Sequence, residues 1–358
     1  MDNDRAGHVS RRTLLAGTAA IAAGAIHAGL VAAGVADQKL GGRDWSKIRG
    51  FNYQPSYGSS GFELWQKFAP AVIKRELGVG KKYFPGMNAI RLWLSWDSFL
   101  RNPKRFANNF DTSLAIAAEH GLAVMPVLFN RWHDAVLDYG GIYIDHFLPK
   151  VSWVQKAGMF DRYMAAVVGG HKDDPRVLAW DLCNEPYSYS CPREQIPQIV
   201  QAETAWLQGL YDKCKALGAK APITVGIHPG VPLEMVNSMT DLLSIHPYFI
   251  HNTKTPNKTV YEKKLDADVA YARKVGKPIL ASECCWGDLD DKVRVESIRY
   301  TLTQLKARGI GWLVYLLHHS LIADAHRPEF GPVGGPGNLA FIEADESLRP
   351  GHELFNEF

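Results

Sequence analysis

The chain has 358 residues, of which 46% are hydrophobic, 22% are charged and 11% are aromatic, and its formal net charge is +3. Two of the positive charges belong to Arg11 and Arg12 near the amino terminus, so the rest of the chain is close to neutral. It therefore lacks the basic face that binding to nucleic acid requires.

The first 36 residues have the pattern of an export signal. Ser10-Arg11-Arg12-Thr13-Leu14-Leu15 places paired arginines before an Ala/Gly-rich run that reaches about Ala36. This pattern predicts a bacterial twin-arginine signal peptide over 1–36, with a periplasmic or extracellular mature protein that has no stable association with a membrane. The alternative is a membrane anchor that stays in place, since the run is long enough to span a bilayer.

The remaining residues, 37–358, contain no low-complexity tract and no Pro/Ser-rich linker, so we expect one domain. The five cysteines have no metal-ligand spacing, and an odd number cannot all pair. We interpret Cys183, Cys284 and Cys285 as small apolar residues at strand ends, and leave open whether a disulfide forms.

Short apolar runs alternate with amphipathic stretches along the whole of this domain. The runs predict eight strands, at 48–53, 88–94, 122–129, 177–183, 222–227, 242–247, 278–282 and 310–316. Helical patterns lie between most of them, for example at 111–120, 197–217 and 260–275. Glycines before or near the strands indicate helix ends at positive φ, namely Gly86, Gly121, Gly218, Gly276 and Gly309. Eight β/α units predict a (β/α)8 TIM barrel, whose active site lies at the carboxyl ends of the strands.

The second and third predicted strands carry polar groups that an apolar barrel does not explain. In the second strand Arg91 shares a face with Trp93 and Ser95, so a guanidinium points into the barrel. A buried arginine needs an anion as its partner. That anion is either a carboxylate in a purely structural salt bridge or a catalytic carboxylate. The third strand ends at Asn130-Arg131-Trp132-His133, and His133 either lines the site or packs within its own loop.

The fourth, sixth and seventh strands end in groups suited to acid–base chemistry. The fourth ends in Asn184 and Glu185, although a glutamate there could also cap a helix. The sixth places His246 and Tyr248 on one face, and the seventh delivers Glu283. Two carboxyl groups that face each other across a barrel can cleave a glycosidic bond, with one as proton donor and the other as nucleophile.

The eighth strand ends in His318 and His319, but adjacent strand residues point to opposite faces. We therefore expect no metal and no other cofactor.

The chain resembles glycoside hydrolase clan A, most closely family 5, through Asn184-Glu185-Pro186, Glu283, Arg91 and His246-Pro247-Tyr248. The resemblance runs from about Ile48 to Arg349-Pro350-Gly351-His352. The resemblance implies a retaining, metal-free mechanism with Glu185 as acid/base and Glu283 as nucleophile. It also implies that Asn184 binds the sugar 2-hydroxyl, that Arg91 and Tyr248 position the nucleophile, and that His246 lines the site.

One position departs from that family. Its members usually present a Trp after the eighth strand as the floor under the reacting sugar, and here Tyr315 stands at that place. Either Trp312 or Trp286 then forms the floor, or the floor is the smaller ring of Tyr315. Trp96 is a further candidate for stacking on a sugar.

The loops after the third and eighth strands, 134–154 and 328–337, are long enough to wall a pocket. They favour exo action or short oligosaccharides. The strings Asn52-Tyr53-Gln54-Pro55 and Trp96-Asp97-Ser98-Phe99 also look similar to exo-acting β-mannosidase branches of family 5, which implies β-mannosides as substrates. An endo-acting β-1,4-mannanase or β-glucanase would share the same catalytic residues. A carbohydrate-binding barrel without catalysis is the alternative from another class.

Overall fold

The computed structural model describes residues 37–131, 141–148, 153–187, 193–249, 257–322 and 339–358. Residues Val35–Phe358 form one compact unit. The leader expected over 1–36 lies outside the described residues and stays a prediction. No helix within the described ranges is both long enough and apolar enough to cross a membrane.

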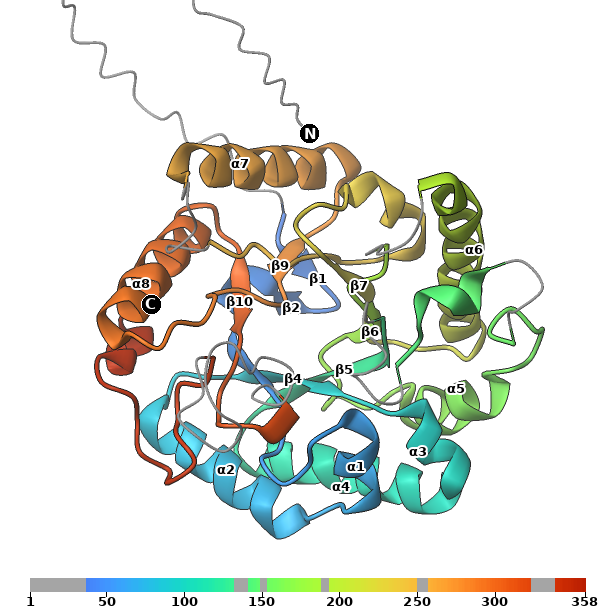
Figure 1. Ribbon diagram of the computed structural model, residues 1–358, viewed down its shortest axis with the longest axis horizontal. Helices are drawn as coiled ribbons and strands as arrows, with labels where there is room; N and C mark the ends of the chain where they lie inside the picture. The colour runs from blue at the N-terminus through green and yellow to red at the C-terminus, as the bar shows by residue number, and fades with distance from the viewer. Residues whose placement is uncertain (1–36, 132–140, 149–152, 188–192, 250–256, 323–338) are drawn as a thin grey trace, which may run out of the picture. The chain divides into compact units, whose positions relative to one another are not determined.

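Eight parallel strands close into a barrel in the order β10-β3-β4-β5-β6-β7-β8-β9 (Figure 1). The strands are β3 (Arg49–Tyr53), β4 (Ala89–Trp93), β5 (Ala123–Asn130), β6 (Trp180–Asn184), β7 (Ile223–Ile227), β8 (Leu243–Ile245), β9 (Ile279–Ala281) and β10 (Gly311–Val314). Each lies within two or three residues of a predicted run, so the predicted strands and the TIM barrel are confirmed.

Helices surround the strands in Figure 1 and cover their outer faces. They are α1 (Gly61–Gln66), α2 (Pro70–Tyr83), α3 (Trp96–Arg101), α4 (Pro103–Glu119), α5 (Asp161–Val167), α6 (Ile196–Ala216), α7 (Lys258–Val275) and α8 (Asp291–Ala307). The helix expected at 111–120 begins earlier because Asn102 and Pro103 start it, and the Asn102 side chain accepts a hydrogen bond from the Arg105 amide at 3.0 Å. The connection from β7 to β8 contains only the short 3-10 helices η5 (Leu233–Met235) and η6 (Asn237–Met239).

Four of the five glycines expected at positive φ have it; Gly276, for example, ends α7 with φ 67°. The prediction for Gly86 is wrong. Helix α2 ends at Tyr83, and Gly86 lies in a turn closed by the bond from the Met87 amide to the Phe84 carbonyl at 3.0 Å. This turn reverses the chain without a left-handed residue.

The barrel interior has an apolar part and a polar part. Strands β1 (Lys39–Leu40) and β2 (Arg43–Asp44) form a hairpin, and Trp45 follows it. Trp45 packs against apolar side chains near the amino ends of the barrel strands, including Ala89, Leu178, Ala179 and Leu242. Further along the strands lies a set of fully buried polar side chains, Asn52, Arg91, Asp181, Thr224, Ser244 and Ser282. Buried polar groups require partners, so this polar layer must be bonded internally.

Four cysteines lie in the described part of the chain, and all of them are buried with free thiols: Cys183, Cys214, Cys284 and Cys285. Cys191 lies outside the described residues.

Candidate active site

Arg91 is the group around which the polar layer is built. Its Nε and Nη2 donate to Asp181 Oδ2 at 3.0 and 2.7 Å, and its Nη1 donates to Glu283 Oε1 at 2.5 Å. Burial disfavours the charged guanidinium, but the carboxylates of Asp181 and Glu283 outweigh it and raise the pKa of Arg91 above its ordinary value. Arg91 is therefore a fixed positive charge inside the barrel.

Two asparagines occupy the remaining sides of this guanidinium. Asn52 Oδ1 accepts from Arg91 Nη1 at 3.1 Å, and Asn184 Oδ1 accepts from Nη2 at 2.8 Å. Because an arginine can only donate, each amide must turn its oxygen toward Arg91. The Asn184 NH2 group then donates to Asn130 Oδ1 at 3.0 Å, which fixes the whole side chain beside Glu185.

Glu283 accepts a hydrogen bond at each oxygen. Arg91 reaches Oε1, and the Tyr248 hydroxyl donates to Oε2 at 2.6 Å. Burial and the nearby Glu283 charge raise the pKa of Tyr248 well above its ordinary value, so the phenol keeps its proton. Donors at both oxygens are the pattern of an ionised carboxylate.

Glu185 has a different neighbour, the ring of His246. His246 Nδ1 lies 2.8 Å from Glu185 Oε1, and its Nε2 lies 3.0 Å from the Ser282 hydroxyl. The Ser244 hydroxyl donates to Ser282, whose own proton then points to His246 Nε2. This order leaves the ring proton on Nδ1, where it faces Glu185.

The two glutamates face each other at short range. One oxygen of Glu185, one oxygen of Glu283 and a ring nitrogen of His246 all lie within 4.8 Å of one another. Carboxyl groups about 5 to 5.5 Å apart are typical of retaining glycosidases, whereas inverting enzymes hold them farther apart to admit a water. An approach of two carboxylate oxygens within 4.8 Å is compatible with the short separation that retaining enzymes use.

A β-bulge brings both Asp181 and Asn184 to the barrel interior. Strict alternation would put residues three apart on opposite faces, but the pairing of β6 with β7 shifts register between Asp181 and Asn184. Glu185 follows with φ 47°, a conformation uncommon outside glycine, and its amide donates to the Gly226 carbonyl at 2.8 Å. Behind the bend, buried Glu203 of α6 accepts from the Tyr187 amide at 3.2 Å and holds the turn in place.

Strand β7, which the sequence left without an interpretation, provides the space for this arrangement. A Cβ on Gly226 would lie 2.7 Å from His246 Nε2 and 3.1 Å from both Arg91 Nη2 and Asp181 Oδ2. The Gly226 amide also donates to Asp181 Oδ1 at 3.1 Å. A side chain at this position would collide with the polar layer.

The predicted aromatic residues are not all in one place. Trp286 packs edge-on against Tyr248 with ring centroids 5.3 Å apart, and Tyr315 packs edge-on against Trp93 at 6.1 Å, so both lie near Glu283. Trp96 is instead stacked on Trp153 at 5.0 Å, which covers a face of its ring.

Trp312, the other candidate for the sugar floor, is fully buried, with the Arg49 guanidinium 3.5 Å from its ring centroid. The floor is therefore left to Trp286 or Tyr315.

Several expectations fall outside the described residues or were incomplete. His133, most of the loop at 134–154 and the loop at 328–337 lie outside them, so their roles stay predictions. The sequence reasoning missed Asp181 and Ser282. The need of a buried Arg91 for anions could have pointed to Asp181, because it is an acid inside an otherwise apolar strand.

Two clusters in the described part of the chain hold metal-binding types of residue at short range. The first is Glu185, His246 and Glu283, where Arg91 already supplies positive charge to Glu283. A guanidinium in contact with a carboxylate opposes a metal cation there.

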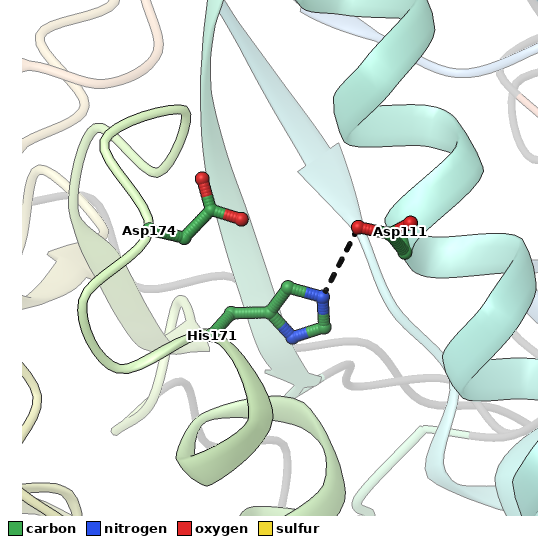
Figure 2. A group of neighbouring side chains, drawn as sticks. All are labelled: Asp111, His171 and Asp174. Carbon is green, nitrogen blue, oxygen red and sulfur yellow. Dashed lines mark ion pairs between the residues drawn. The ribbon is translucent and has the colours of Figure 1, made fainter.

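The second cluster is Asp111, His171 and Asp174 (Figure 2). Here Arg176 Nη2 lies 2.6 Å from Asp111 Oδ1 and 2.6 Å from Asp174 Oδ2. The guanidinium thus lies between the two carboxylates, and we interpret this cluster as an ion-pair network on the outside of the barrel.

Comparison with known proteins identifies the family of the chain. Residues 80–320, about two thirds of the chain, match the family model described as cellulase (glycosyl hydrolase family 5). The chain is 28% identical over 106 residues to a mannan endo-1,4-β-mannosidase F of Aspergillus clavatus, which covers 28% of this chain and 23% of that protein. It is 24% identical over 233 residues to mannan endo-1,4-β-mannosidase 8 of Oryza sativa subsp. japonica, covering 56% of each.

Among solved structures, an exo-β-1,4-mannosidase from Opitutaceae bacterium strain TAV5 matches with a TM-score of 0.63 and 18% identity, over 86% of this chain and 58% of that one. The chain thus spans between about a quarter and three fifths of the length of these proteins. The match to the family model covers the strands that carry Arg91, Glu185 and Glu283. The chain belongs to the cellulase family, glycosyl hydrolase family 5.

Proposed function

We propose that this protein is a retaining β-glycosidase that hydrolyses β-mannosidic linkages, with Glu283 as nucleophile and Glu185 as acid/base. The observation that carries the proposal is the pair of carboxyl groups with oxygens within 4.8 Å, placed in different hydrogen-bonding environments. Glu283 is held between Arg91 and Tyr248, whereas Glu185 lies beside His246. Two acids with different surroundings can divide the roles of base and acid.

In the first step Glu283 attacks the anomeric carbon of the sugar while Glu185 donates its proton to the glycosidic oxygen. The bond from the anomeric carbon to that oxygen breaks, and the alcohol leaves. In the second step Glu185, now ionised, takes a proton from water, and the resulting hydroxide attacks the anomeric carbon. Glu283 leaves as a carboxylate, and the product keeps the β configuration.

Variants of the two acids test this assignment. We expect Glu283→Gln to abolish hydrolysis of an aryl β-mannoside, because no nucleophile remains. Glu185→Gln should still release an activated dinitrophenol, which needs no proton, but then turn over slowly, and added azide should restore its rate by forming a β-mannosyl azide. An α-configured first product in NMR would refute the retaining assignment. Full activity in both variants would refute the roles of the two acids.

We propose exo action, because the solved exo-β-1,4-mannosidase and this chain share their fold over most of this chain. The curated relatives are named as endo-acting mannosidases, which keeps endo action as the second candidate. Release of mannose from mannobiose and mannotriose, with no fall in the viscosity of mannan, is the expected result. A rapid fall in viscosity before any mannose appears would favour the endo enzyme.

We also propose that residues 1–36 direct export by the twin-arginine route. The support is the Arg11-Arg12 pair before an Ala/Gly-rich run. Replacement of both arginines by lysine should retain the protein in the cytoplasm of a bacterial host, whereas the parent chain should reach the periplasm or medium. Equal export of the two forms would contradict this proposal.

A further inference from the structure

Gln54 and Tyr315 meet at the rim of the barrel through neighbouring strands. Gln54 follows β3, Tyr315 follows β10, and these strands pair in parallel with Val314 opposite Phe51. The Tyr315 hydroxyl donates to Gln54 Oε1 at 3.2 Å. The pair therefore joins the first and last strands of the barrel at its carboxyl end, where the site lies.

Tyr315 is next to the groups that hold Glu283. Its ring packs edge-on against Trp93, and the Arg91 guanidinium lies 4.6 Å from the centroid of that same Trp93 ring. The Tyr315 amide donates to the Cys284 carbonyl at 3.0 Å, one residue after Glu283. A sugar whose anomeric carbon meets Glu283 would thus have Tyr315 close to its ring.

Gln54 has hydrogen-bonding capacity that the protein does not use. The residue is only 7% exposed, and Oε1 has Tyr315 as its partner. Within the described ranges the NH2 group donates no hydrogen bond, and it is not among the solvent-inaccessible polar atoms that lack a partner. A largely buried amide with two unused donors that solvent can reach is suited to a ligand oxygen.

The segment that carries Gln54 is firmly anchored. On β3, Asn52 points into the barrel to Arg91, so alternation turns Tyr53 outward and Gln54 back toward the rim. The Tyr53 hydroxyl donates to buried Glu76 of α2 at 2.6 Å, and the Ser56 hydroxyl donates to the same carboxylate. Bonds on both sides of Gln54 place its amide in advance of substrate binding.

We propose that Gln54 and Tyr315 form a polar pair that binds one hydroxyl of the reacting sugar, at C3, C4 or C6, and so selects among sugars. This inference rests on the proposed function, in which Asn184 takes the 2-hydroxyl. Arg91 contacts Asn184 through Nη2 and Glu283 through Nη1, and β4 and β5 separate the β6 of Asn184 from the β3 of Gln54. The pair is therefore on another side of the sugar ring, and it places a hydroxyl and an amide where family members usually present a tryptophan.

Deoxy sugars combined with single variants test the pairing. The substrates are aryl β-mannosides and their 2-, 3-, 4- and 6-deoxy forms, and the variants are Gln54→Met and Tyr315→Phe. For one of the 3-, 4- or 6-deoxy sugars we expect the parent enzyme to lose about tenfold or more in kcat/KM relative to the full mannoside. Each variant should lose a similar factor on the full mannoside but less than about threefold on that deoxy sugar.

The controls separate recognition from folding. The ratio of kcat/KM for the full mannoside to kcat/KM for the 2-deoxy mannoside should be the same in the parent enzyme and both variants, since Asn184 binds the 2-hydroxyl. Tyr57→Phe removes a hydroxyl that donates to the Leu64 carbonyl at 3.2 Å, away from the pair, and should leave every ratio unchanged. If Tyr315→Phe does not fold, Tyr315→Trp should show the same loss of discrimination.

Equal losses on the full and all deoxy mannosides in both variants would overturn the pair while leaving the proposed function intact. A parent enzyme that hydrolyses no glycoside would overturn the proposed function, and this inference with it.

Discussion

Gly226→Ala is the change that most directly tests whether the polar layer is tightly packed. The new Cβ would lie 2.7 Å from His246 Nε2, and ordinary contact begins at 3.4 Å, so the ring must move by about 0.7 Å. Ser282 and Glu185 hold the two ring nitrogens, and the new Cβ cannot shift away from the ring because it would also lie 3.1 Å from Arg91 Nη2 and from Asp181 Oδ2. The ring cannot move without breaking one of these contacts.

Two opposing terms set the effect on stability. Overpacking a well-filled interior costs about 1 to 3 kcal/mol. Alanine also restricts the unfolded chain, which returns about 0.4 to 1 kcal/mol where the backbone permits it, and Gly226 is not among the residues at positive φ. We expect a net loss of roughly 1 to 2 kcal/mol. A displacement approaching 1 Å in a catalytic site lowers kcat by about 10- to 100-fold.

The assay combines urea denaturation with kcat on an aryl β-mannoside. Gly209→Ala is the matched control, because Gly209 is an exposed residue of α6 and its Cβ would meet no atom within 4 Å. The control should gain about 0.5 to 1 kcal/mol from helix propensity and keep full activity. A folded Gly226→Ala protein with kcat within twofold of the parent would refute the packing argument.

Three further changes have expected magnitudes. Tyr248→Phe removes the donor at Glu283 Oε2 and should lower kcat about 10- to 100-fold. Because it leaves a buried carboxylate oxygen without this donor, it should also lower the unfolding free energy measured in urea by about 1 to 3 kcal/mol. Asp181→Asn leaves Arg91 with one carboxylate and should cost about 3 kcal/mol of unfolding free energy, whereas an unchanged urea midpoint would show that the ion pair contributes nothing. Burial lowers the pKa of His352 from its ordinary value of 6.5 to about 3. Between pH 6.5 and pH 3 the histidine is therefore protonated in the unfolded chain but neutral in the folded chain. The unfolding free energy should therefore fall by about 1.4 kcal/mol for each unit by which the pH is lowered from 6.5 towards 3. In urea titrations at several pH values, His352→Phe should remove this contribution to the pH dependence.

The barrel was predictable because its strands are short apolar runs that end in polar residues. A parallel barrel collects the carboxyl ends of all strands on one face, so residues as distant in sequence as Arg91 and Glu283 can be expected together. The contact of 2.5 Å between them follows from that topology. The order of the strands predicts which residues are neighbours, and the need of a buried guanidinium for an anion explains why Arg91 lies there.

Other parts of the site give little signal in the sequence. Asp181 lies three residues before Asn184, and only the β-bulge in β6 puts both inside the barrel. A period-2 reading cannot place an irregularity of one residue. Gly226 acts through the absence of a side chain, and Ser282 is one small hydroxyl among many, so neither stands out until their neighbours are known.

The presence of Asp181 beside Arg91 has a consequence for the proposed reaction cycle. When Glu283 forms an ester with the sugar, it loses the negative charge that faces Arg91. A fully buried guanidinium without an anion would cost several kcal/mol and would raise the energy of that intermediate. Asp181 accepts from two nitrogens of Arg91 and has no part in the covalent step, so it compensates the guanidinium in both states of Glu283. The second carboxylate thus lets one buried arginine stabilise an anionic nucleophile without making its neutral ester unfavourable.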